Sequence, residues 1–321
     1  MKLFPLHLIP NDTRFDVMRG RYIALTVTLL LLFASIGVIA IKGFHYALDF
    51  TGGTVIEVRF DKPADVDGVR QRLEAVGYDN AQVQSFGSAS DLLIRLQPQD
   101  GQNTTDAHNR TAQTVLTAVS APDNTATVLR NEFVGPQVGK ELALNGVYAA
   151  VFMLVGFLIY IAFRFEWKFA VAASVTAVFD LLLTVGYMSL TEREFDLTVL
   201  AGLLSVMGFA INDIIVVFDR VRENFRTLRV EPLQVLNRSI NQTLSRTIIT
   251  GVMFFLSALA LFLYGGGSLE GLALTHMVGA VIVIASSVFV ACPLLTLGVL
   301  KVSKQDLLPK SKDVEALARR P

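Results

Sequence analysis

The stretch GFAINDIIVVFDRVREN, residues 208 to 224, places an amide and a carboxyl group inside an apolar run. Residues 197–211 are apolar apart from small and hydroxyl side chains, and the run resumes at 214–218 after Asn212 and Asp213. An ionised carboxylate at the centre of a membrane helix costs about 2.5–3.5 kcal/mol on insertion scales, so it needs a partner or a polar cavity. If this run spans a membrane, Asp213 is therefore a candidate functional residue.

Arg246 is a candidate partner for Asp213 if their two apolar runs are antiparallel. Asp213 precedes Arg220 by seven residues and Arg246 follows Arg238 by eight, which places each about 10–12 Å inside a basic rim in helical geometry. Burial favours the neutral form of a carboxyl group, whereas a nearby arginine favours the ionised form. A carboxyl group under both influences can load and release a proton when the arginine moves. A static ion pair that only locks two helices together remains the alternative.

Asp180 is a second carboxyl group in an apolar run, within AVFDLLLTVG. The same two interpretations, proton handling and structural pairing, apply to it. His276 lies near the end of another apolar run, where a hydrogen-bonded histidine at the membrane interface is expected more often than a proton donor.

A stripe of small and polar residues borders Asp213. Ala201, Ser205, Gly208 and Asn212 recur at spacings of 4, 3 and 4, so they share one helix face and suit close helix packing. Asp213 lies about 100° round the helix from Asn212. We therefore expect the Asp213 carboxylate to point toward a contact between helices rather than toward lipid.

Other kinds of chemistry find no support in the sequence. Cys292 is the single cysteine, and the four histidines lack metal-ligand spacing. There is no nucleophile elbow, phosphate loop or metal motif, so the sequence predicts neither an enzyme nor a cofactor. A formal net charge of zero gives no bulk attraction to nucleic acid.

The segment DFTGGT, from Asp49 to Thr54, contains two adjacent glycines. It can be read as a glycine-rich binding loop. The favoured interpretation is that Gly52 and Gly53 form a sharp turn between the first helix and the first strand.

The composition indicates an integral membrane protein. Of the 321 residues 52% are hydrophobic and only 17% are charged, against about 25% charged in soluble domains; mean hydropathy is +0.51. A spanning helix needs about 20 mostly apolar residues. Six segments qualify, namely Tyr22–Ile41, Gly146–Phe163, Phe169–Leu190, Asp196–Phe218, Thr247–Tyr264 and Leu272–Leu295. The first is expected to be an uncleaved anchor, because its apolar core is long and no cleavage motif follows.

Lysine and arginine are concentrated in alternating loops, which sets the expected orientation. The opposite short loops hold only Arg193. Both termini are therefore expected in the cytoplasm. The predicted organisation is an N-terminal cytoplasmic segment 1–21, a first span 22–41, a periplasmic domain 42–144, a bundle of five spans 145–300, and a cytoplasmic tail 301–321.

The periplasmic segment alternates strand and helix patterns. Ile56, Val58 and Phe60 alternate at period 2, as in a strand, whereas residues 64–76 carry Val66, Val69, Leu73 and Val76 at helical spacing. Strands at 82–86, 91–97 and 125–134 and a helix at 107–120 complete the order β-α-β-β-α-β. The predicted fold is therefore an all-α six-helix transmembrane bundle with a small α+β ferredoxin-like domain.

Four motifs, in this order around six spans, resemble the SecF family: LDFTGGT (48–54), VGPQVGKEL (134–142), GFAINDIIVVFDRVREN (208–224) and NQTLSRTIITG (241–251). This family is the smaller partner of SecD in the bacterial Sec export machinery, within the resistance-nodulation-division superfamily. The resemblance covers residues from about 15 to 300 and is specific in the combination of motifs.

The resemblance implies a function. Members pair with SecD, which supplies six further helices, and associate with the SecYEG channel and commonly with YajC and YidC in the inner membrane, in contact with lipid. They use the proton-motive force, without ATP, to draw out a preprotein that SecA has pushed. The implied proton path contains Asp213 and Arg246, with Asn212 and Asp180 in less certain roles. The motifs also contain the implied structural positions Asp49, Gly52, Gly53, Gly135 and Pro136.

The sequence departs from the family pattern at three positions. Hydroxyl residues are expected on both sides of the Ile-Asn-Asp motif, where this chain has Ala210 and Ile214. Phe179 replaces an expected histidine before Asp180. A relay through hydroxyl groups would here need water or Asn212 instead.

Three functions compete on this basis. The first is a proton-coupled export subunit, whose partner completes the path across a pseudo-symmetric interface. The second is a non-conducting scaffold that stabilises SecD and the larger translocase assembly. The third, a small-molecule efflux pump, is disfavoured because one set of six helices and a single outer domain leave little room for a substrate pocket.

Overall fold

The computed structural model describes residues 13–78, 81–86, 88–96, 105–121 and 123–303. The chain divides into two compact units. The second unit contains Tyr46–Ala149 and Glu194–Leu197, and the first contains most of the remaining helical chain.

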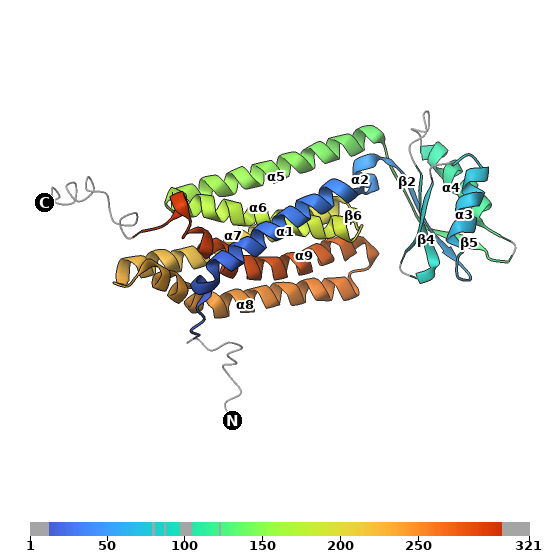
Figure 1. The fold of residues 1–321 in the computed structure, drawn as a ribbon. Helices are drawn as coiled ribbons and strands as arrows, with labels where there is room; N and C mark the ends of the chain where they lie inside the picture. Colours follow the sequence, from blue (N-terminus) through green and yellow to red (C-terminus); the bar gives the residue numbers. More distant parts are fainter. Residues whose placement is uncertain (1–12, 79–80, 87, 97–104, 122, 304–321) are drawn as a thin grey trace, which may run out of the picture. The chain divides into compact units, whose positions relative to one another are not determined.

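Within the described ranges, six helices are long and apolar enough to cross a membrane, in agreement with the predicted number of spans. Figure 1 shows them as α1 (Arg21–Lys42), α5 (Pro136–Arg164), α6 (Trp167–Leu190), α7 (Leu197–Thr227), α8 (Pro232–Tyr264) and α9 (Gly267–Ser286). A short 3-10 helix, η1 (Val17–Gly20), precedes α1. After α9 the chain continues as a π-helical stretch, Ser287–Ala291, followed by α10 (Cys292–Leu294) and the 3-10 helix η3 (Gly298–Leu300).

Helices α7 and α8 extend past the predicted ends of the fourth and fifth spans. Their extensions are polar on the outside but pack against each other through Asn224 of α7. Its amide nitrogen donates to the Ser239 hydroxyl at 2.9 Å and to the Gln242 side-chain oxygen at 2.8 Å. Val221 of α7 and Leu236 of α8 are buried in the same region, so apolar packing as well as this polar contact stabilises the two extensions.

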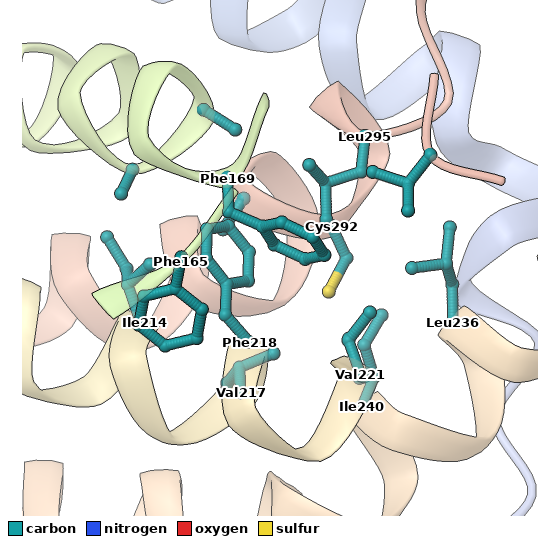
Figure 2. Packing of buried hydrophobic residues seen from close by; sticks show 14 of the residues in the cluster. Phe165, Phe169, Ile214, Val217, Phe218, Val221, Leu236, Ile240, Cys292 and Leu295 are labelled. Carbon is teal, nitrogen blue, oxygen red and sulfur yellow. The ribbon is translucent and has the colours of Figure 1, made fainter. Parts of the chain in front are cut away.

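An apolar cluster at one end of the helical unit joins α6, α7, α8 and the segment after α9 (Figure 2). Phe169 and Phe218 meet edge to face with ring centroids 5.2 Å apart, and Phe165 packs beside both. Cys292 is fully buried in the same cluster. Close approach of α7 and α9 depends on Gly279, because a Cβ atom there would collide with the Val206 side chain.

The second unit contains a four-stranded antiparallel sheet in the order β3-β4-β2-β5, from β2 (Gly53–Phe60), β3 (Gln82–Phe86), β4 (Ser88–Leu96) and β5 (Ala126–Val134). Helices α3 (Val66–Ala75) and α4 (Thr105–Val119) cover one face (Figure 1). The order β-α-β-β-α-β confirms the predicted small α+β fold. Ile56, Val58 and Phe60 are buried as expected, but Val76 is exposed because α3 ends before it.

The first two family motifs meet in this unit. A one-turn helix, α2 (Leu48–Thr51), leads into β2 through Gly52 and Gly53, whose φ angles are +70° and +125°. These are conformations that favour glycine, as the turn interpretation expects. Gly139 of α5 packs on this turn, where a Cβ atom would lie 3.0 Å from the Gly52 nitrogen. Gly135 precedes Pro136, the first residue of α5, and its carbonyl oxygen accepts the Gly139 N–H at 3.0 Å.

The α6–α7 connection is also held in the second unit. Its short strand β6 (Glu194–Phe195) pairs with β1 (His45–Tyr46), and the Ala47 N–H donates to the Phe195 carbonyl oxygen at 2.9 Å. The Glu194 carboxylate pairs with Arg95 and accepts a hydrogen bond from Gln84 at 2.6 Å.

Asp49 caps helix α7. Its Oδ2 atom accepts the backbone N–H of Leu197, the first residue of α7, at 3.0 Å. The first N–H groups of a helix have no partner within the helix, so an aspartate oxygen here satisfies one of them and complements the positive end of the helix dipole. The glycine motif thus fixes the start of the helix that carries Asp213.

We predict that Asp49→Ala loosens the first turn of α7. The free energy that protects the Leu197 amide from hydrogen exchange should fall by about 0.5–2 kcal/mol, the usual effect of losing a cap. Asp49→Asn keeps an acceptor oxygen and serves as the matched control. Exchange measured by mass spectrometry on the purified chain tests this, and unchanged protection in Asp49→Ala would refute the cap.

Candidate functional site: a buried carboxyl cluster

Asp213 of α7 is almost fully enclosed, with 4% of its surface exposed. The Thr247 hydroxyl of α8 donates to its Oδ1 atom at 2.8 Å. Its Oδ2 atom is buried and has no hydrogen-bond donor among the described residues. One of the two carboxyl oxygens is therefore buried without a hydrogen-bond partner among the described residues, and such a buried polar atom is destabilising.

Asp180 of α6 lies within electrostatic range of Asp213. It is 0% exposed, and neither of its oxygens has a donor within the described chain. Two neighbouring carboxylates repel each other, and burial adds a desolvation cost to each ionised form. The structure thus brings together the two carboxyl groups that the sequence identifies in separate apolar runs.

Two further hydroxyl groups border the pair, from Ser286 and Ser287 at the end of α9. Ser286 interacts with Asp180 and Ser287 with Asp213. Both serines are buried, at 1% and 0% exposed. With Thr247, three hydroxyl groups from two neighbouring helices surround two carboxyl groups from two others.

Arg246 is not an ion-pair partner of Asp213 in the described structure. The side chain that contacts Asp213 belongs to the next residue, Thr247, while Arg246 is exposed and acts on Asp213 at longer range. One residue of helix turns a side chain by about 100°, so Thr247 faces inward and Arg246 faces the open side of α8.

Asn212 and the small-residue stripe also face outward. Ala201, Ser205 and Asn212 are exposed, and Gly208 is partly covered, with Met153 of α5 in contact range of it. The expected contact between helices along the stripe is therefore not formed by this chain alone. Asp213 points instead to the opposite, buried side of α7. The Nδ1 atom of His276 lies 2.9 Å from the Leu272 carbonyl oxygen of its own helix.

Sequence reasoning missed Thr247, Ser286 and Ser287. Thr247 follows Arg246 in the motif SRTIITG, and helical spacing alone does not show which of two neighbours faces inward. The adjacent serines in IASSVFVAC are a visible polar interruption of an apolar run. Such serines often donate only to a carbonyl oxygen of their own helix. Their presence in an apolar run therefore does not by itself indicate a functional site.

Comparison with known proteins places the chain in a family. Residues 114–300 match the model described as "Protein export membrane protein SecD/SecF, C-terminal", and residues 37–64 match the SecD/SecF GG motif. The chain belongs to the SecF family. It is 42% identical over 281 residues to the protein translocase subunit SecF of Escherichia coli O157:H7, covering 87% of this chain and 86% of that protein. It is 39% identical over 311 residues to the SecF of Vibrio alginolyticus, covering 96% of each.

The fold is shared with solved SecDF structures. The crystal structure of SecDF from Thermus thermophilus, described as a translocon-associated membrane protein, aligns with a TM-score of 0.79 at 37% identity over 91% of this chain. A second SecDF structure, in a super-membrane-facing form, aligns with a TM-score of 0.65 at 34% identity over 98% of this chain. This chain spans 39% and 41% of those SecDF chains, so it corresponds to less than half of SecDF. The SecF family implies a translocase complex with SecD.

We predict that Thr247→Val destabilises the helical unit, because it removes the hydroxyl that donates to Asp213 while nearly preserving side-chain volume. The free energy of unfolding in detergent should fall by about 1–3 kcal/mol, the cost of a buried polar group left without its partner.

A double-mutant cycle supplies the control for this prediction. In an Asp213→Leu background the same Thr247→Val change should cost much less, because no carboxyl oxygen is then deprived of its donor. Equal losses in both backgrounds would show that the hydrogen bond contributes nothing.

Proposed function

We propose that this chain is the SecF subunit of a SecD–SecF complex that uses the proton-motive force for late-stage preprotein translocation through SecYEG. The observation that carries the proposal is the enclosed pair Asp180 and Asp213, whose oxygens have too few donors among the described residues. A carboxyl group in this setting is stabilised by holding a proton, and it becomes costly when the proton leaves. Such a pair can bind a proton transiently at a position partway across a membrane.

The scale of the driving force fits this role. One charge crossing 100 mV is worth about 2.3 kcal/mol, and an ionised carboxylate at a helix centre costs about 2.5–3.5 kcal/mol on insertion scales. The two magnitudes are comparable, so passage of one proton can offset the ionisation of one carboxyl group. Arg246 is exposed on α8 but lies within electrostatic range of Asp213. Movement of its positive charge therefore changes the free energy needed to ionise Asp213.

The surroundings of the site support a partner subunit. The stripe that contains Asn212 and the Arg246 side chain are exposed in this chain, and both belong to helices that carry the site. We propose that SecD covers this side and completes the proton path, as in the two-halved architecture of the resistance-nodulation-division superfamily. SecYEG, YajC, YidC, the preprotein and, functionally, SecA are the further proposed partners.

The proposed location is the bacterial inner membrane with both termini in the cytoplasm. The distribution of arginine and lysine supports this orientation. The sheet-containing domain, residues 42–144 in the sequence-based division, is then periplasmic, on the side where a preprotein emerges. The proposed activity is energy coupling, with no enzymatic step and no cofactor.

The proposal predicts that Asp213→Asn abolishes the response to a proton gradient. Membrane vesicles would carry a stalled, partly translocated preprotein, ATP would be removed, and a proton gradient would be imposed. Completion of translocation should proceed with the unaltered chain and stop with the variant, because asparagine does not exchange a proton in this range. Equal protein levels and intact co-purification with SecD are required of both.

Asp219→Asn is the matched control. It removes a carboxylate from the same helix, but one that pairs with Arg164 at 3.0 Å and is partly exposed. It should leave the gradient response intact. If Asp213→Asn assembles and still responds fully, the proton route lies elsewhere and the scaffold function takes its place.

A further inference from the structure

Ser286 and Ser287 lie where the α-helical part of the sixth span gives way to a π-helical stretch, Ser287–Ala291. Each hydroxyl donates back to its own helix: Ser286 to the Val283 carbonyl oxygen at 3.2 Å and Ser287 to that of Ile284 at 3.1 Å. Both bonds are long for hydroxyl donors, which usually reach their acceptors at about 2.7–2.8 Å. Ser174, which bonds back to Ala170 in α6, does so at 2.9 Å.

Each of these weakly bonded hydroxyl groups also lies within interaction range of a carboxyl group that has at least one oxygen without a donor among the described residues. Ser287 interacts with Asp213 and Ser286 with Asp180. Oδ2 of Asp213 and both oxygens of Asp180 are buried without a donor among the described residues. A hydroxyl hydrogen turns about its C–O bond, and serine has three staggered χ1 positions, so each serine has two competing acceptors.

The charge on the carboxyl group decides between these two acceptors. A hydrogen bond to an ionised acceptor is roughly twice as strong as one between neutral groups. When the carboxyl group is protonated, the serine hydroxyl keeps donating to the backbone carbonyl oxygen of its own helix. When the carboxyl group is ionised, the hydroxyl donates to the carboxylate instead.

We propose that Ser287 is a positioning residue that changes its hydrogen-bond acceptor with the charge of Asp213. When Asp213 is protonated, the Ser287 hydroxyl donates to the Ile284 carbonyl oxygen. When the proton leaves Asp213 for the proton path, the same hydroxyl donates to the carboxylate and releases that carbonyl oxygen. No covalent bond forms or breaks in Ser287. Ser286 has the equivalent relation to Asp180. The proposal rests on the proposed function, in which Asp213 exchanges a proton.

The released carbonyl belongs to a tightly packed part of the bundle. Ile284 lies against Gly251 of α8, where a Cβ atom would collide with the Ile284 side chain. Gly251 is one helical turn from Thr247, the other hydroxyl donor to Asp213. A change in hydrogen bonding at Ile284 therefore acts at a close contact between α8 and α9. π-Helical segments, which depart from regular i to i+4 bonding, recur at functional sites.

Hydroxyl groups on neighbouring helices take the place of those that were expected on both sides of the Ile-Asn-Asp motif and that this chain lacks there. Ala210 and Ile214 offer no hydroxyl group on α7, and Asn212 faces the open side. Thr247 and Ser287 supply hydroxyl groups to Asp213 from the neighbouring helices instead.

Infrared spectroscopy of the SecD–SecF complex in liposomes tests the change of acceptor. The carboxylate stretching bands of Asp213 are identified as those that Asp213→Asn removes from a pH-difference spectrum. In Ser287→Ala these bands should shift, because the carboxylate has lost a donor. In Ser174→Ala, which removes a serine that bonds back to its own helix away from the pair, they should stay in place. Unshifted bands in Ser287→Ala would overturn the inference.

The stalled-preprotein assay tests the consequence for coupling. Ser287→Ala should slow gradient-driven completion by about tenfold, the effect of losing one charge-assisted hydrogen bond, with ATP-driven translocation unchanged. If the bands shift but gradient-driven completion is unaffected, Ser287 has no part in coupling and the inference fails.

Two additions keep the test decisive. If Ser287→Ala does not assemble, Ser287→Cys fills the same space with a weaker donor and should give a smaller shift of the same bands. Asp213→Asn in the same assay separates the two claims. If Asp213→Asn loses the gradient response while Ser287→Ala behaves normally, only the inference about Ser287 is refuted. If Asp213→Asn responds fully to the gradient, the proposed function is refuted.

Discussion

Among the residues that the structure describes, two carboxyl groups enclosed by apolar helices have too few hydrogen-bond donors, and this shortage constrains the rest of the helical unit. Burial of Asp180 and Asp213 is less costly when neighbouring helices bring polar groups to them, because an ionised carboxylate without partners is destabilising in such surroundings. Thr247, Ser286 and Ser287 are those groups. Thr247 donates to Asp213 at 2.8 Å, whereas Ser286 and Ser287 make longer bonds, at 3.2 and 3.1 Å, to carbonyl oxygens of their own helix.

Close packing maintains this arrangement. Gly279 and Gly251 let α9 approach α7 and α8 closely, and the aromatic cluster around Phe169 and Phe218 fixes one end of the bundle. At the start of α7 the Asp49 carboxylate caps the helix that carries Asp213. The glycine motif and the carboxyl site are thus connected along one continuous helix.

Much of the fold follows from patterns in the sequence. The six spans are predictable because membrane helices require long apolar runs, and the β-α-β-β-α-β order is predictable because strand and helix periodicities differ. Asp180 and Asp213 stand out for the same reason, as carboxyl groups within apolar runs. The inward direction of Thr247, the outward direction of Arg246 and Asn212, and the role of the two serines depend on helix rotation. Packing sets that rotation, and at Ser287 a π-helical stretch alters it, so periodicity alone does not predict these features.

The most direct test of the account is to measure proton movement itself. Proteoliposomes containing the complete translocase, a stalled preprotein and an internal pH-sensitive dye would report proton flow during gradient-driven completion. The account predicts a dye signal that accompanies translocation with the unaltered chain and disappears with Asp213→Asn. A signal of equal size in the variant would contradict it, because protons would then cross without using the buried carboxyl group.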